Sequence, residues 1–162
     1  MGSGPDCVAI EYLARSMSTN ATNDSDLLRQ FENRTLPFEQ WSHRMHVRIA
    51  YLYLRDFPFD DALLKMRSGI KAYNAANKVP ESATSGYNET TTVAFMRLIH
   101  GTMTAYGKAF PTTDSASFCD THPHLLSKQI LRLFYSPERR MHPDAKSRFI
   151  EPDLAPLPKV RG

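Results

Sequence analysis

Apolar residues recur at the three- and four-residue spacing of an amphipathic helix in five stretches of the chain. We therefore predict helices at residues 25–34, 38–56, 60–76, 87–107 and 124–135. A further short helix is expected at residues 144–149. In the fourth stretch, the β-branched run Thr90–Val93 favours a strand by propensity. Met96 and Ile99 restore the helical spacing beyond it, so we predict a helix there as well.

Prolines and polar runs separate these stretches. Pro37 and Pro58 end the first two helices, because the residue before a proline resists the α conformation. Residues 77–86 are predicted to form a polar loop, and residues 110–123 a second irregular stretch. Prolines keep residues 151–158 extended. The predicted fold is therefore all-α: a bundle of four to five helices with an extended, proline-rich C-terminal strap.

Composition and charge narrow the class of protein. The chain has 162 residues, of which 41% are hydrophobic and 23% charged, which is ordinary for one globular domain. A domain of this size can bury a sufficient core without disulfide bonds or a structural metal. We expect a flexible arm at residues 1–22, a single helical domain at 23–158 and a tail at 159–162. A net charge of +3, with scattered basic residues, argues against a nucleic-acid partner.

Location is predicted from what the sequence lacks. No apolar run approaches the ~18 residues of a membrane span, and no secretory signal opens the chain. The two cysteines, Cys7 and Cys119, form no metal-binding or redox pair, so we expect reduced thiols. These features predict a cytoplasmic protein without a membrane partner, as a monomer or small homo-oligomer.

Two histidines three residues apart carry the main functional signal. On a helix, the spacing of His43 and His46 puts their Cβ atoms about 5–6 Å apart on one face. That face continues through Ala50 and Tyr53, which can be buried, so both imidazoles are predicted to point inward. A metal ion would satisfy two buried imidazoles at once. Core histidines with ordinary hydrogen-bond partners are the alternative.

Catalytic zinc and iron sites normally have three protein ligands, so the pair needs a third. Glu89 is the best candidate, because it heads a face of the fourth helix that continues through Val93 and Met96. A first-turn carboxylate that interacts with the helix dipole explains Glu89 without a metal. Glu39 is the next candidate. His100 is too far away, about 16 Å from Glu89 along the helix at 1.5 Å per residue.

A series of short motifs resembles a known family. In order along the chain they are Leu36-Pro37, Trp41-Ser42-His43-x-x-His46, Arg67-x-Gly69-Ile70-x-x-Tyr73-Asn74, Gly86-Tyr87-Asn88-Glu89-Thr90 and Glu151-Pro152-Asp153-Leu154. Over residues 31–157, the series is similar to a family of small uncharacterised helical proteins with W-[ST]-H-x-x-H and G-Y-H-E-T motifs. The resemblance brings no substrate, but it implies that the histidine pair and Glu89 belong together. Asn88 stands where the family has histidine, which increases the importance of Glu89.

These observations predict a metal-dependent enzyme that acts on a small organic molecule. His43, His46 and Glu89 would hold one divalent metal, Fe, Zn or Mn. Iron with these ligands would support oxidation, and zinc would support hydrolysis or hydration. The sequence does not choose between them.

Five further residues complete the predicted site. Arg67 and Asn74 lie seven residues apart on one helix face and are expected to bind a substrate carboxylate or carbonyl. Trp41 is assigned to substrate binding as well. Tyr87 is assigned with Glu89 to the catalytic residues, and both Tyr87 and Tyr53 are candidate proton donors. A salt bridge for Arg67 and core packing for the tyrosines are the structural alternatives.

Two other function classes fit the same residues. One is a non-catalytic helical module, either a small-molecule carrier that uses the histidine pair as hydrogen-bond donors or an interaction domain. The other is a metal-free enzyme in which Glu89 is a general base beside His43. The chain has no nucleophile elbow, P-loop or dinucleotide motif, which argues against serine hydrolases and nucleotide-dependent enzymes.

Overall fold

A computed structural model describes residues 23–161, and this part of the chain contains helices, turns and loops but no strand. The predicted all-α class is therefore confirmed. The predicted arm at residues 1–22, with Cys7, lies outside the described residues, as does the last residue of the predicted tail. No helix within 23–161 is both long and apolar enough to cross a membrane.

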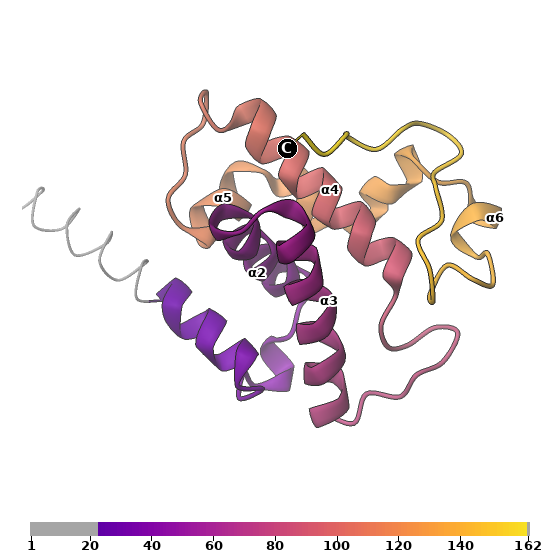
Figure 1. Cartoon of the computed structure of the whole chain (residues 1–162), viewed down its shortest axis with the longest axis horizontal. Coiled ribbons are helices and arrows are strands. Elements are labelled where there is room, and N and C mark those ends of the chain that lie inside the picture. Colours follow the sequence, from indigo (N-terminus) through magenta and orange to yellow (C-terminus); the bar gives the residue numbers. More distant parts are fainter. Residues whose placement is uncertain (1–22, 162) are drawn as a thin grey trace, which may run out of the picture.

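Residues 23–32 are helical, and a series of named elements follows them. The first are the 3-10 helix η1 (Phe38–Gln40) and the α-helices α2 (His43–Asp56), α3 (Phe59–Ala76), α4 (Glu89–Tyr106) and α5 (Ser115–Thr121). Next come the 3-10 helices η2 (Pro123–Leu126) and η3 (Lys128–Leu133), and then the short α6 (Pro137–Arg140). The remaining residues are turns and an extended C-terminal segment. Figure 1 shows this order along the chain.

The predicted helix at residues 38–56 is interrupted. It divides into η1 and α2 because Trp41 leaves the helical conformation and Ser42 is extended, with φ −95° and ψ 169°. The Ser42 hydroxyl accepts a hydrogen bond from the backbone N–H of Met45, which makes Ser42 the N-cap of α2. The first turn of α2 therefore begins at His43.

The predicted helix at residues 124–135 is wrong in type. Ser127 is extended, and its hydroxyl caps the N–H of Gln129, so this stretch forms two 3-10 helices in place of one α-helix. The irregular stretch predicted at residues 110–123 instead contains α5, capped by the Asp114 carboxylate at the N–H of Ser117. Residues 144–149 form turns without a helix.

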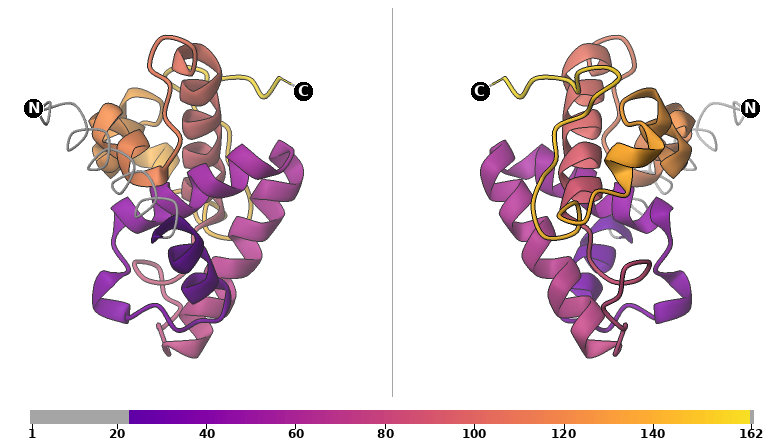
Figure 2. Two further views of the ribbon diagram at one scale, coloured as in Figure 1. Left: turned by 90° about the vertical axis from the view of Figure 1, so that its left-hand side faces the viewer. Right: turned by 90° about the vertical axis from the view of Figure 1, so that its right-hand side faces the viewer.

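Helix α2 lies at the centre of the fold. Every residue from Val47 to Leu54 is buried, and α2 packs against α3, α4 and α5 (Figures 1 and 2). The 23–32 helix packs on this core through Leu27 and Phe31. Gly69 of α3 permits that contact, because a Cβ added at Gly69 would lie 2.6 Å from the Phe31 ring. Burial of these apolar side chains is the main stabilising contribution to the fold.

One ion pair is buried in this core. Arg48 is 7% exposed, and its guanidinium donates to the Asp24 carboxylate at 3.2 Å and to the Ser115 hydroxyl at 2.7 Å. The backbone N–H of Ser115 donates to the same carboxylate at 2.8 Å. The network ties the 23–32 helix to α2 and α5 and satisfies the buried charges.

The C-terminal segment holds α4 in place. The first two N–H groups of α4 donate to this segment. The N–H of Glu89 donates to the carbonyl of Lys146, and that of Thr90 to the carbonyl of Ala145, both at 3.0 Å. Leu157 is buried, and a Cβ added at Gly101 of α4 would lie 2.6 Å from Pro158. Figures 1 and 2 show the segment running beside α4. The segment therefore positions the N-terminus of α4, where the predicted motif with Glu89 begins.

Candidate functional site

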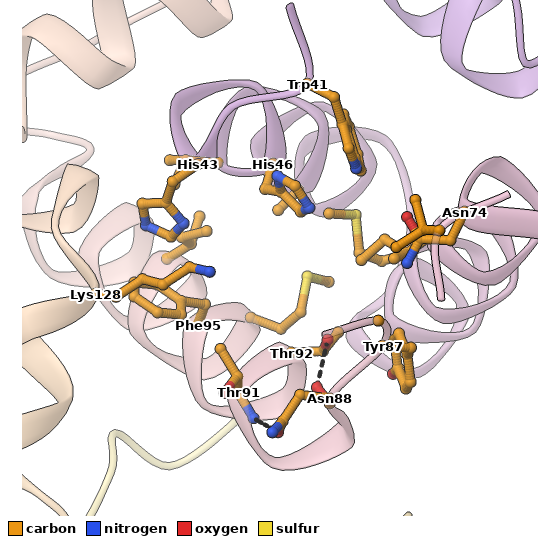
Figure 3. Close-up of a pocket in the computed structure, with 18 of the residues that line it drawn as sticks. Trp41, His43, His46, Asn74, Tyr87, Asn88, Thr91, Thr92, Phe95 and Lys128 are labelled. Carbon is orange, nitrogen blue, oxygen red and sulfur yellow. Dashed lines mark hydrogen bonds between the residues drawn. The ribbon is translucent and has the colours of Figure 1, made fainter. Parts of the chain in front are cut away.

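A cavity of about 250 Å³ lies between α2, α3, the start of α4 and η3. Figure 3 shows side chains from all four elements converging on it. Most of its wall is apolar and includes Trp41, Val47, Met66, Ile70, Phe95 and Met96. Its polar groups include His43, His46, Asn74, Asn88, Thr91 and Lys128. A mainly apolar wall with a few convergent polar groups is typical of small-molecule sites.

Both histidines of the predicted pair line this cavity, as their spacing on α2 predicts. His43 Nε2 lies 3.0 Å from the carbonyl oxygen of Leu125, and His46 Nδ1 lies 2.7 Å from that of Ser42. A carbonyl oxygen only accepts hydrogen bonds, so each of these nitrogens carries the proton. The other nitrogen of each neutral ring, Nδ1 of His43 and Nε2 of His46, therefore has a free lone pair.

Burial keeps both imidazoles neutral. It lowers the pKa of His46 to about 4. The hydrogen bond to Ser42 opposes this effect, and repulsion from protonated His43 and from Lys128 reinforces it. Burial also lowers the pKa of His43 below its ordinary value of 6.5, against a smaller opposing effect of the hydrogen bond to Leu125. At neutral pH the two rings therefore present acceptors to the cavity, where the small-molecule carrier was expected to use them as donors, because backbone carbonyls take their N–H groups. Figure 3 shows the two rings side by side on the α2 wall.

Trp41 fixes the orientation of His46. The two rings are in contact, with centroids 3.8 Å apart and planes inclined by 32°. The other side of the indole packs on Phe31, at 5.1 Å, and on Tyr73, at 4.6 Å. Trp41 is the single tryptophan of the chain, and it lines the cavity as predicted for a substrate contact. Its fluorescence therefore reports directly on this site.

Glu89 is held away from the histidines by two other residues. Arg67 donates two hydrogen bonds to Glu89 Oε1, at 3.1 and 2.5 Å, and one to Oε2, at 3.0 Å. The Tyr87 hydroxyl donates to Oε2 at 2.5 Å. Burial tends to raise the pKa of Glu89, but the hydrogen bonds from Arg67 and Tyr87 outweigh it and hold the pKa below its ordinary value. Glu89 is thus an ionised carboxylate whose two oxygens are both occupied.

The structure does not bring the three predicted metal ligands together. Among the described residues, no group of three or more His, Cys, Asp or Glu side chains could hold a metal ion. The ring centroids of His43 and His46 are 6.5 Å apart. Even with both nitrogens turned inward, they would be farther apart than the ~3 Å between two nitrogens bound at 2.0–2.1 Å to one ion. As arranged here, these residues do not fit a shared metal.

Only some of the predicted substrate and proton-donor residues line the cavity. Asn74 and Tyr87 line the cavity, whereas Arg67 does not, because its guanidinium pairs with Glu89. The salt-bridge alternative for Arg67 is therefore the observed one. Tyr53 is also away from the cavity, and its hydroxyl donates to Glu32 at 3.1 Å.

Several polar residues of the wall were not predicted as site residues, among them Lys128, Asn88 and Thr91. Lys128 begins η3 and is the only charged side chain that lines the cavity within residues 23–161. The predicted 124–135 helix did not place it near His43. Asn88 both lines the cavity and caps α4, since its side-chain oxygen accepts from the N–H of Thr91 at 2.9 Å. Asparagine is a preferred N-cap, a signal that was available in the sequence.

Comparison with protein-family models, curated proteins and solved structures finds no match for this chain.

Proposed function

We propose that this chain binds a small organic molecule in the cavity beside α2, and that the molecule donates a hydrogen bond to the histidine pair. One observation carries the proposal: each imidazole gives its N–H to a backbone carbonyl and keeps its lone pair for the cavity. Two fixed, neutral acceptors in an apolar wall are complementary to a ligand hydroxyl or N–H group.

The size of the cavity limits the ligand. Its volume of about 250 Å³ is a little below the ~300–1,000 Å³ typical of drug-sized ligands. The ligand is therefore a small metabolite whose apolar part contacts Trp41, Met96 and their neighbours. Its hydrogen-bonding part is directed at His43 and His46.

Binding is better supported than catalysis by Glu89. A general base acts best when its pKa is near the working pH, but the pKa of Glu89 is held low and both its oxygens already accept hydrogen bonds. His46, with a pKa of about 4, is also a weak base at neutral pH. The arrangement favours the binding module over the metal-free enzyme.

A metal-dependent enzyme is the second candidate, and one observation favours it. Histidines that bind metals almost always donate their other ring N–H to a carbonyl or carboxylate, and His43 and His46 both donate in this way. This candidate requires that the rings move closer and that Glu89 leave Arg67. Elemental analysis of the purified protein tests it.

The binding proposal is tested with a matched pair of probes, benzyl alcohol and benzyl methyl ether. They share an aromatic ring but only the alcohol has a hydrogen-bond donor. Each is titrated into the full chain while Trp41 emission is recorded. We expect the alcohol to change the emission at lower concentration, about 5- to 10-fold, as one net hydrogen bond of about 1 kcal/mol predicts.

Variants complete the test. The double variant His43→Phe/His46→Phe is expected to bind the two probes equally, because the acceptors are gone. The exposed His124, outside this cavity, provides the control: His124→Gln retains the preference. Equal binding of the two probes to the wild type, or no emission change with either, would refute the proposal.

A further inference from the structure

Asn74 has hydrogen-bonding capacity that the protein does not use. It is 8% exposed, and it lines the cavity from α3. Within residues 23–161 its backbone carbonyl accepts from Val79, but its side-chain amide has no hydrogen-bond partner. The amide can make several hydrogen bonds. It is not among the fully buried polar atoms that lack a partner, so it can be reached from the cavity. Figure 3 shows the amide at one end of the cavity.

Lys128 lies at the opposite end. Figure 3 shows its side chain passing Phe95 and its amine directed into the cavity near His43. It is the only charged residue of the wall, and no acidic side chain within the described residues lines the cavity with it. Its charge is close enough to contribute to the lowered pKa values of both histidines. The cavity therefore has one cationic end and one neutral amide end, separated by apolar side chains.

We propose that the ligand is a small monocarboxylic acid with a second polar group at its far end. The carboxylate pairs with Lys128, and the second group, a hydroxyl or amide, hydrogen bonds to Asn74. The donor that contacts His43 and His46 in the proposed function lies between these two ends (Figure 3). This inference rests on the proposed function, since it concerns the same cavity. It gives the Asn74 amide, which has no side-chain hydrogen bond within residues 23–161, a partner in the cavity.

A single negative charge fits better than two. Lys128 supplies one positive charge, and the lone pairs of His43 and His46 oppose further negative charge in the cavity. Phosphate sites usually combine several N–H donors or arginine side chains, and the wall has no arginine. A carboxylate is thus favoured over a phosphate monoester.

The test uses 4-hydroxyphenylacetate and two relatives that each lack one feature. 4-Hydroxyphenylacetamide has no charge, and phenylacetate has no hydroxyl group. Dissociation constants come from Trp41 emission and from protein-observed NMR with assigned amide signals. We expect the hydroxy acid to bind about 10-fold more tightly than phenylacetate, because the lost hydrogen bond is worth about 1.4 kcal/mol. It should bind about 3-fold more tightly than the uncharged amide, because Lys128 is exposed and water screens its charge.

Two variants assign the two ends. Lys128→Met should remove the preference for acid over amide and leave the hydroxyl preference unchanged. Asn74→Ala should remove the preference for the hydroxyl group and leave the preference for acid over amide unchanged. Lys128→Arg is expected to keep most of the preference for the acid, because the charge is retained. Lys108→Met is the control, since Lys108 is exposed and does not line the cavity.

The outcomes separate this inference from the binding proposal. If the amide binds in the cavity as tightly as the acid, the charged end is wrong while the proposed function stands. If phenyl phosphate binds more tightly than all three probes, the choice of carboxylate is wrong. If none of these anions perturbs Trp41 while benzyl alcohol does, the ligand class is refuted and binding at the histidine pair is upheld.

Discussion

At the residue scale, His46 shows how burial determines chemistry. Its ring contacts the indole of Trp41, with centroids 3.8 Å apart, and its pKa is lowered to about 4. A protonated imidazole quenches a neighbouring indole. We therefore predict that Trp41 emission falls on acidification with a midpoint near pH 4, and that His46→Gln lacks this transition. A midpoint near 6.5, the ordinary value, would show that His46 is solvated.

The same lowered pKa predicts how stability depends on pH. Unfolded His46 takes up a proton near pH 6.5, whereas folded His46 does so only near pH 4. Its contribution is therefore present above pH 6.5 and is lost as the pH falls to about 4, by up to about 3 kcal/mol. Urea denaturation at pH 7.5 and pH 5 measures this loss in the free energy of unfolding. The wild type should lose more stability than His46→Gln over this range; equal losses would contradict the prediction.

Glu89 is predicted to stabilise the fold through Arg67. Glu89→Gln weakens the charge-assisted bonds at 2.5–3.1 Å to Arg67, and we expect the free energy of unfolding to fall by about 1–3 kcal/mol. Arg67 is partly exposed, so water compensates for some of the loss. A double-mutant cycle with Arg67→Met isolates the pair. The control is Asp26→Asn, at the exposed ion pair with Arg29. There we expect the free energy of unfolding to fall by about 0.5 kcal/mol or less.

At the element scale, the sequence predicted the long helices and missed the short ones. Helices α3 and α4 match the predicted 60–76 and 87–107 closely, because their apolar spacing continues over several turns. The starts of α2 and α5 depend instead on Ser42 and Asp114, whose side chains cap the first turns. These N-cap signals are present in the sequence. The 3-10 form of η2 and η3 has no comparable signal, since it follows from packing.

The C-terminal strap is predicted to contribute to stability through one side chain. Leu157 is 5% exposed, and Leu154, in the same segment, is 58% exposed. We expect Leu157→Ala to lower the free energy of unfolding by about 2–4 kcal/mol, because it opens a cavity in the core. Leu154→Ala should change it by less than about 0.5 kcal/mol. Equal effects in thermal or urea denaturation would show that the strap is not docked on α4.

At the scale of the whole molecule, the site depends on contacts between elements far apart in the sequence. His43 and His46 could be paired from their spacing alone, and they do share the cavity. Their partners Leu125 and Lys128 are about 80 residues away in the chain, so local periodicity carries no information about them. The same limit applies to Glu89. Its position on the helix was predicted, but its pairing with Arg67 depends on how α3 packs against α4.

Metal content distinguishes the two candidate functions for the whole protein. We predict that protein purified without a His-tag contains no stoichiometric iron, zinc or manganese, because Glu89 is held by Arg67 and Tyr87 and the imidazoles are too far apart. Elemental analysis measures this. A chelator should leave the melting temperature and the Trp41 emission unchanged. A metal that binds only the folded state would stabilise it by about 2.7 kcal/mol at 100 times its Kd, so manganese added to the chain should give no such shift. One equivalent of metal, lost in His43→Ala but kept in His124→Ala, would instead support the metalloenzyme and show that the rings and Glu89 rearrange on binding.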